Sequence, residues 1–408
     1  MNNQSQNILL ILLLVLFNCS EKPKQTKLTE GHYKGVLEVK DNEQLPFNFE
    51  VTSDETLKIY NAEEVIEVDE ITYKNDSVYI KTPIFQVYIT AKIDSNNNLT
   101  GFYKNDELKR KVPFSAYYNV KNRFDTKAQH NVDVSGVWET IFSPNTASDS
   151  YIAKGIFEQN GQNITGTFRT TTGDYRFLEG VVEGDSLKLS TFDGAHAFLF
   201  TAKLTDSTMN GHFYSGNHWK EPFIAKLNIE YELPDANSLT HLKEGYDKFE
   251  FEFPDTDGNL ISLDDEQFRN KVVVVQLMGT WCPNCLDESK YYKAYLEQNK
   301  DKEIAFIALA FEYAKTKERA IENIKRLKDG VGLDYPILLA QFGTSNKSKA
   351  QEKLPMLNHV LSYPTSIFID KKGEVRKIHT GFNGPSTGEK YDEFKKEFES
   401  FMEILINE

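Results

Sequence analysis

The chain has 408 residues, a hydrophobic share of 39%, a charged share of 26% and a formal net charge of −14. This length predicts two or three domains of about 100–200 residues each, and the composition is that of a globular protein, which excludes wholesale disorder. Phosphate binding requires a basic face and no Lys/Arg cluster stands out, so the charge argues against a nucleic-acid partner.

The N-terminus has the pattern of an export signal. Ile8 to Phe17 form an apolar run, which is shorter than the roughly 20 residues that span a bilayer but typical of a signal-peptide core. Leu16-Phe17-Asn18-Cys19 resembles the lipobox of bacterial lipoproteins, and this resemblance implies that Cys19 becomes the acylated first residue of the mature chain. We therefore predict a lipoprotein signal peptide over residues 1–18 and a polar tether over 19–30. A plain secretory leader and an uncleaved anchor are the alternatives.

The next part of the chain is predicted to be all-β. From about Tyr33 to Glu230, short runs of alternating apolar and polar residues are separated by Asn, Asp, Ser and Gly, which is the strand-and-turn pattern. Three segments are echoed about 110 residues later: Asn75 to Ile80 by Gly184 to Leu189, Val87 to Lys92 by Leu199 to Lys203, and Gly101 to Tyr103 by Gly211 to Tyr214. A period this long indicates tandem domains. We predict two β-rich repeats, over 31–120 and 130–230, each a small barrel or sandwich.

The C-terminal part alternates strands and helices. After a linker over Leu233 to Asp257, the pattern predicts the following elements: strands at Lys271 to Met278, Ile304 to Phe311 and Tyr335 to Ala340, helices at Pro283 to Gln298, Lys315 to Lys328 and Tyr391 to Ile406, and a hairpin of Thr365 to Ile369 with Val375 to Thr380. This order is typical of a thioredoxin fold. We therefore predict a multidomain protein, with an all-β N-terminal region followed by an α/β thioredoxin-like domain over residues 245–408.

Two of the three cysteines form a Cys-x-x-Cys motif, Cys282-Pro283-Asn284-Cys285. The motif lies where a predicted strand ends and a helix begins, so backbone N–H groups and the positive helix end favour a thiolate at Cys282. The spacing places Cys285 one helical turn further on, within disulfide distance. Cys282 is expected to attack a substrate, and Cys285 to resolve the resulting mixed disulfide.

Residues from about Phe249 to Glu408 resemble the TlpA/ResA-like branch of thioredoxin-fold reductases. The resemblance rests on Gly279-Thr280-Trp281-Cys282-x-x-Cys285-x-x-Glu288, on Asp257-Gly258-Asn259-x-x-Ser262-Leu263, and on Tyr363-Pro364-Thr365. It implies a cis Pro364 beside the sulfurs, a Tyr363 that offers backbone groups to the substrate, and a Glu288 that handles protons for thiol chemistry. Trp281 and Pro283, which flank Cys282, are further candidates for substrate contact.

The motif departs from the family in one respect. The common dipeptide has Pro second, whereas here Pro283 comes first and Asn284 second. Because the reduction potential is sensitive to this dipeptide, the direction of exchange stays open. Gln276 stands where cytoplasmic thioredoxins carry a buried Asp, which leaves proton handling to Glu288.

The sequence predicts a thiol-disulfide oxidoreductase of the bacterial cell envelope, lipid-anchored on the periplasmic face or the outer membrane. Its expected partners are protein disulfides or thiols and a membrane redox partner. No cofactor is expected apart from the redox-active pair of Cys282 and Cys285. No metal is expected, since a zinc site would need ligands from scattered histidines. A peroxiredoxin-like peroxidase is one alternative, although Val275 and Gly279 stand where its Pro and its Thr or Ser belong. The other is a surface binding lipoprotein with an ancillary redox domain.

Overall fold

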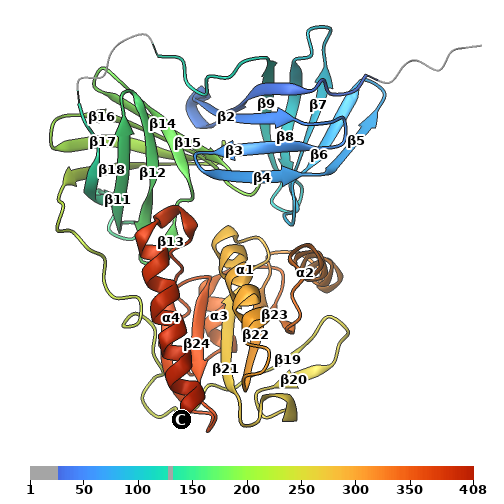
Figure 1. The fold of residues 1–408 in the computed structure, drawn as a ribbon, viewed down its shortest axis with the longest axis vertical. Coiled ribbons are helices and arrows are strands. Elements are labelled where there is room, and N and C mark those ends of the chain that lie inside the picture. The colour runs from blue at the N-terminus through green and yellow to red at the C-terminus, as the bar shows by residue number, and fades with distance from the viewer. Residues whose placement is uncertain (1–25, 127–131) are drawn as a thin grey trace, which may run out of the picture.

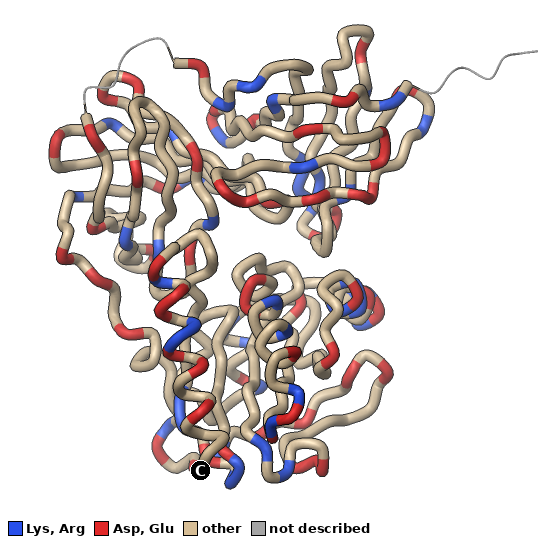
Figure 2. Tube along the Cα trace, in the orientation of Figure 1, with Lys and Arg blue, Asp and Glu red and all other residues tan. Residues whose placement is uncertain are grey.

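The computed structural model describes residues 26–126 and 132–408 as two antiparallel β sheets followed by an α/β domain (Figure 1). The predicted signal peptide, Cys19 and most of the tether lie outside these residues. Within them, no helix is both long and apolar enough to cross a membrane. Among the residues that the structure describes, Lys and Arg are interspersed with Asp and Glu over all three parts (Figure 2).

The first sheet is an antiparallel meander in which the first and last strands pair. Its order is β4-β3-β2-β1-β9-β8-β7-β6-β5, and buried aromatic side chains such as Phe47 and Phe114 fill its interior. The strands are β1 (Gly31–Glu38), β2 (Gln44–Val51), β3 (Leu57–Asn61), β4 (Glu64–Val68), β5 (Glu70–Lys74), β6 (Ser77–Lys81), β7 (Tyr88–Ile93), β8 (Leu99–Asn105) and β9 (Arg110–Tyr118), with a single 3-10 turn η1 (Lys40–Asn42).

The second sheet closes into a barrel because β11 pairs with β10 on one side and β12 on the other. Its fully buried core includes Trp138, whose indole N–H donates to the carbonyl oxygen of Val134 at 2.8 Å. The strands are β10 (Gly136–Phe142), β11 (Tyr151–Asn160), β12 (Asn163–Thr170), β13 (Gly173–Asp174), β14 (Leu178–Glu183), β15 (Ser186–Phe192), β16 (Ala197–Leu204), β17 (Thr208–Ser215) and β18 (Trp219–Leu227). The prediction of an all-β N-terminal region is confirmed.

The C-terminal part, hereafter the redox domain, has a five-stranded sheet in the order β23-β22-β21-β24-β25. Strands β21, β22 and β23 run parallel, and β24 and β25 form an antiparallel hairpin at one edge. Its elements are β19 (Glu252–Pro254), β20 (Leu260–Ser262), η2 (Glu266–Phe268), β21 (Val272–Met278), α1 (Pro283–Gln298), β22 (Ile304–Phe311), α2 (Lys317–Val331), β23 (Ile337–Gln341), α3 (Lys347–Lys353), β24 (Thr365–Ile369), β25 (Val375–Thr380), η3 (Pro385–Thr387) and α4 (Glu389–Asn407). The predicted thioredoxin-type order is confirmed.

Helix α2 is displaced from its predicted bounds for a local reason. The Thr316 hydroxyl accepts from the backbone N–H of Arg319 at 3.2 Å and caps the helix start. Gly332, with φ +74°, ends the helix in the left-handed conformation that glycine adopts freely. The short helix α3 and the β19–β20 hairpin were not predicted, because segments of three to seven residues carry too little periodicity to be recognised.

Candidate active site

The Cys-x-x-Cys motif lies at the junction of the central strand β21 and helix α1, as predicted. Pro283 is the first helical residue, a position where its missing N–H costs no helical hydrogen bond. Cys282 is the N-cap in extended conformation, and its Sγ accepts a hydrogen bond from the backbone N–H of Cys285 at 3.2 Å. This hydrogen bond and the positive end of α1 stabilise negative charge on the Cys282 sulfur.

The two cysteines, both free thiols in this structure, have different surroundings. Cys282 is 7% exposed, whereas Cys285 is fully buried at 0%. Burial, together with the hydrogen bond to Cys282, raises the pKa of the Cys285 thiol well above its usual value. Cys282 is therefore the sulfur that a substrate can meet first, and Cys285 lies protonated beneath it.

Three of the predicted substrate-contacting residues surround Cys282. The Tyr363 carbonyl oxygen lies 3.5 Å from Cys282 Sγ, and the Tyr363-Pro364 peptide bond is cis. The Trp281 ring packs edge-on against the Tyr363 ring with centroids 5.8 Å apart, while its Nε1–H donates to the carbonyl oxygen of Phe311 at 3.0 Å. The fourth predicted residue, Pro283, is buried at the start of α1.

Glu288 lies on α1 one turn beyond Cys285 and is completely buried. Its carboxylate accepts hydrogen bonds from Gln276 Nε2 at 2.8 Å, Tyr292 OH at 2.9 Å and Ser366 Oγ at 3.1 Å. Burial raises the pKa of Glu288 to about 7, although these hydrogen bonds oppose the shift. Gln276 Nε2 also lies 3.3 Å from the Cys285 carbonyl oxygen, which links the carboxyl to the motif. A group with this pKa can take up and release protons near neutral pH.

A second buried carboxyl, Glu312, was missed by sequence reasoning. It accepts hydrogen bonds from the backbone N–H of Thr280 at 2.8 Å and from the Thr280 hydroxyl at 2.7 Å. Burial raises its pKa to about 7 as well. The signal was present in the sequence: Glu312 directly follows the buried strand β22, and the carboxyl ends of the parallel strands β21 and β22 meet at one edge of the sheet.

The second β sheet covers part of the redox centre, which the sequence did not predict. The Thr172 carbonyl oxygen accepts from Ser362 Oγ at 2.9 Å, and Asn284 Nδ2 lies 3.4 Å from both the carbonyl and a carboxylate oxygen of Asp174. Asp174 also accepts from the Gly384 N–H and the Ser386 hydroxyl, both at 2.8 Å. We call residues Thr171–Asp174 the cap. It contacts the residue before Cys285 and the residue before Tyr363.

A buried arginine joins the three parts of the molecule next to α1. Arg176 pairs with Asp287 of α1, with Glu64 of the first sheet at 2.8 Å and with Asp193 of the second sheet at 3.3 Å. Its side chain is 6% exposed. The nearby carboxylates raise the pKa of Arg176 well above its usual value despite the opposing effect of burial. Arg176 therefore holds the cap close to the redox centre through charge.

The site is thus a dithiol on a thioredoxin fold, with two buried carboxyls near it. Among the residues that the structure describes, no group of three or more His, Cys, Asp or Glu side chains is arranged to hold a metal ion. A vicinal dithiol of this kind can exchange two electrons with a substrate disulfide. The fold and the motif together form an arrangement that is able to carry out thiol-disulfide exchange.

Known proteins with this combination are similar to the chain. Residues 234–394 match the Redoxin family. The thiol-disulfide oxidoreductase ResA of Bacillus thuringiensis is 30% identical over 146 residues, which cover 36% of this chain and 73% of that protein. The thioredoxin-like protein YneN of Bacillus subtilis is 27% identical over 140 residues, covering 34% of this chain and 73% of the relative. A solved thiol:disulfide interchange protein of Chlorobium tepidum aligns over 40% of this chain and 98% of its own, with 18% identity and a TM-score of 0.29.

The chain belongs to the TlpA/ResA-like family of thiol-disulfide oxidoreductases. It is an enzyme that exchanges electrons between thiols and disulfides. Val275 and Gly279 stand where a peroxiredoxin-like peroxidase carries its Pro and its Thr or Ser, which argues against the peroxidase alternative.

Proposed function

We propose that the protein is a disulfide reductase that works through a mixed disulfide on Cys282. This proposal rests on the different surroundings of the two cysteines. Cys282 is the N-cap and the more exposed sulfur, while Cys285 is buried and its thiol has a raised pKa. Cys282 thiolate attacks one sulfur of the substrate, whose S–S bond breaks and whose departing thiolate takes a proton. Cys285 then loses its proton and attacks Cys282 Sγ, which forms the internal disulfide and releases the second substrate thiol. Two electrons pass from the cysteine pair to the substrate.

Glu288 is proposed as the group that receives the Cys285 proton. It lies one helical turn from Cys285, with a pKa near 7, and Gln276 connects it to the backbone of the motif. Trp281, Tyr363 and Pro364 are proposed to hold the substrate next to Cys282, since the Tyr363 carbonyl is within 3.5 Å of that sulfur. Pro283 contributes by fixing the start of α1.

Trapping of mixed disulfides tests the assigned order. Cys285→Ser is expected to accumulate covalent complexes with envelope proteins, because attack still occurs and the resolving thiol is gone. Cys282→Ser is the matched control and should trap few or none. Complexes are compared on non-reducing gels of acid-quenched cells, with dithiothreitol treatment as reference. Equal trapping by the two variants would refute the roles proposed here.

The cellular location of the protein is also a proposal. The apolar run over Ile8 to Phe17 and the lipobox-like Leu16-Phe17-Asn18-Cys19 support export and acylation of Cys19 on the bacterial envelope. A lipid anchor there would bring the dithiol near a membrane redox partner that reduces it again. Membrane fractionation of Cys19→Ser decides the point: the variant is expected in the soluble fraction, and its retention on membranes after a high-salt wash would contradict lipidation.

The β region is proposed to be a tandem duplication. Both sheets pair their first strand with their last, β1 with β9 and β10 with β18. The echoed segments occupy matching strands, since Ser77–Lys81 forms β6 and Ser186–Phe192 forms β15 nine strands later. The two copies differ in closure, because β12 pairs with β14 in the second sheet, whereas β4 and β5, at the two ends of the first sheet, do not pair with each other.

A further inference from the structure

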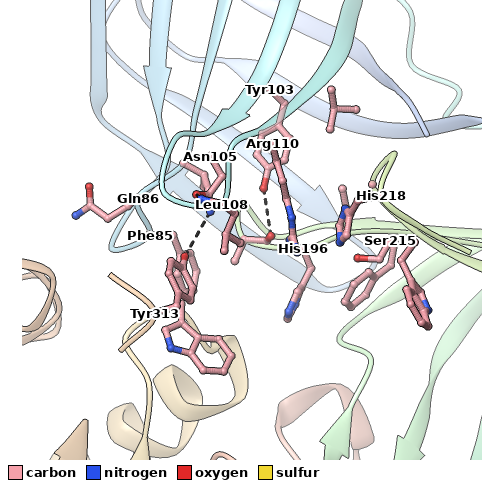
Figure 3. A pocket seen from close by; sticks show the side chains of 18 of the residues that line it. Phe85, Gln86, Tyr103, Asn105, Leu108, Arg110, His196, Ser215, His218 and Tyr313 are labelled. Carbon is pink, nitrogen blue, oxygen red and sulfur yellow. Dashed lines mark hydrogen bonds between the residues drawn. The ribbon is translucent and has the colours of Figure 1, made fainter. Parts of the chain in front are cut away.

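A pocket of about 550 Å³ lies where the three parts of the molecule meet (Figure 3). The first sheet contributes Phe85 and Tyr103, the second sheet Phe198 and Trp219, and the redox domain Trp281 and Tyr313. Its volume is in the usual range of small-molecule sites, about 300–1,000 Å³, and aromatic walls are typical of such sites. Trp281, the residue before Cys282, lines the pocket, whereas Cys282 itself does not. An occupant would therefore have to extend past Trp281 to bring a sulfur to Cys282.

Arg110, the first residue of β9, gives the pocket its charge. It is the one Lys or Arg among the lining residues that the structure describes, and none of these is Asp or Glu. Within residues 26–126 and 132–408, the Arg110 guanidinium has no hydrogen-bond or ion-pair partner, which is unusual for a half-buried cation. Figure 3 shows it beside His218. Burial and the neighbouring Arg110 lower the pKa of His218 to about 4, so that ring is neutral at pH 7.

The cap limits how a substrate reaches Cys282. Thr172 and Asp174 contact Ser362 and Asn284, and so cover the surface next to Tyr363 and Cys285. The pocket instead meets the centre at Thr280 and Trp281. A slender substrate that enters through the pocket can place a sulfur near Cys282 without displacing the cap.

We propose that this pocket binds the carboxylate of a slender disulfide substrate, with the carboxylate on Arg110 and the apolar or aromatic body against the ring walls. The occupant is a small organic disulfide or the end of an extended peptide, and the shared chemistry is a carboxylate attached to a disulfide. This inference rests on the proposed reductase function and adds a substrate specificity to it. The reaction is the exchange described above: the substrate S–S bond is reduced, and Cys282 and Cys285 are oxidised in one turnover, with no further reductant.

Single-turnover kinetics of the reduced full-length protein test the proposal. Dithiobis(nitrobenzoate) is an aromatic disulfide with a carboxylate on each ring, and dithiodipyridine is a neutral aromatic disulfide. Arg110→Gln is expected to raise the half-saturating concentration of the first probe about 10- to 100-fold, because a charge-assisted hydrogen bond is lost. The same variant should leave that of dithiodipyridine within about twofold. Arg110→Lys keeps the charge but loses the planar fork, and should fall in between.

Lys111→Gln is the matched control. Lys111 is the next residue of β9, its Nζ lies 3.8 Å from the Phe102 ring centroid, and it does not line the pocket. This variant removes the same charge and should change neither probe. If Arg110→Gln affects both probes equally, or neither, the pocket is not a carboxylate site, while the reductase function stands. If the reduced wild type consumes neither probe, the reductase function itself fails.

A second experiment, with peptide disulfides, distinguishes the two possible sources of the carboxylate. A short peptide disulfide with a free C-terminus is compared with its C-terminally amidated form. A preference of the wild type for the free acid, abolished by Arg110→Gln, identifies a peptide end as the occupant. If amidation has no effect while the nitrobenzoate preference holds, the site takes small organic disulfides. Equal kinetics for both peptides, together with no nitrobenzoate preference, overturn the proposal.

Discussion

Two regions of the molecule bury charge in opposite ways. At the junction of the three parts, Arg176 forms ion pairs with Asp287, Glu64 and Asp193. Beneath the cysteines, Glu288 is held by a carboxamide and two hydroxyls, and none of these partners is a cation. The junction therefore pairs its carboxylates with a cation and serves to hold the parts together. The redox centre has titratable charge and can move protons near pH 7.

The difference shows what each region is built to do. A buried ion network contributes to stability only while every member is present, since removal of one partner leaves uncompensated charge in a low dielectric. A carboxyl without a cation is costly when ionised, and its pKa rises for that reason. Substitutions at the junction should therefore act mainly on stability, and substitutions at the centre mainly on rate and its pH dependence.

The largest effect is expected at the junction. Arg176→Met keeps the side-chain volume but removes the buried cation that Asp287, Glu64 and Asp193 share. We expect a loss of about 3–5 kcal/mol in the free energy of unfolding, measured by urea denaturation. Lys203→Gln removes an ion pair with Asp185 whose side chains are 70% and 60% exposed, and should cost less than about 1 kcal/mol. Similar losses for the two variants would mean that the junction is no stronger than a surface pair.

The next effect is expected at the centre. Glu288→Gln keeps the shape of the buried side chain but removes its proton chemistry, and should slow exchange about 10- to 100-fold near neutral pH. The wild-type rate should rise through pH 7 as Glu288 ionises, and the variant should lose that inflection. Glu297→Gln, on the same helix but outside the site and partly exposed, is the control. An unchanged pH–rate profile in Glu288→Gln would remove this residue from the mechanism.

The raised pKa of Glu288 also determines how the free energy of unfolding changes with pH. Folding lifts the pKa of Glu288 from an ordinary 4.5 to about 7, so the folded state binds this proton more tightly than the unfolded state. The stability that the group contributes is fully present below about pH 4.5 and is lost as pH rises through about 7. The change amounts to about 3 kcal/mol, and Glu288→Gln should flatten the decline in unfolding free energy over that range. Glu312 adds a second, similar component that the variant retains.

The redox domain was predicted closely because its chemistry and its periodicity coincide. The helix over Pro283–Gln298 and the hairpin strands Thr365–Ile369 and Val375–Thr380 agree with the structure residue for residue. Each is marked locally, by a proline at a helix start or by a Lys-Lys-Gly-Glu turn between apolar runs. The positions of Cys282, Trp281 and Tyr363 followed from that framework.

The cap and the junction could not be predicted from the sequence. Arg176 looks like an ordinary polar residue between two strands, and Asp174 is separated from Asn284 by 110 positions in the chain. Long-range packing between separate sheets decides their role, and neither propensity nor alternation carries that information. Glu312 could be predicted only in part. The strand before it was predicted, but its contact with Thr280 is evident only when strands β21 and β22 are placed side by side.

The smallest effect is expected where the two regions touch. Gly173 in the cap has φ +146°, and a Cβ added there would lie 2.4 Å from Asn284 Nδ2. Gly173→Ala should therefore weaken the docked cap by about 1 kcal/mol, since the Asn284 carboxamide has to move and its long hydrogen bonds to Asp174 are lost. Cys282 is then uncovered more often, and its alkylation by iodoacetamide should be roughly fivefold faster, followed by mass spectrometry. Gly161→Ala is the control, because Gly161 also has a positive φ, +61°, but its added Cβ meets nothing within 4 Å. Equal alkylation rates in both variants would show that the cap does not shield the Cys282 thiol. The contacts that hold the parts of the molecule together would then have no effect on access to the redox centre.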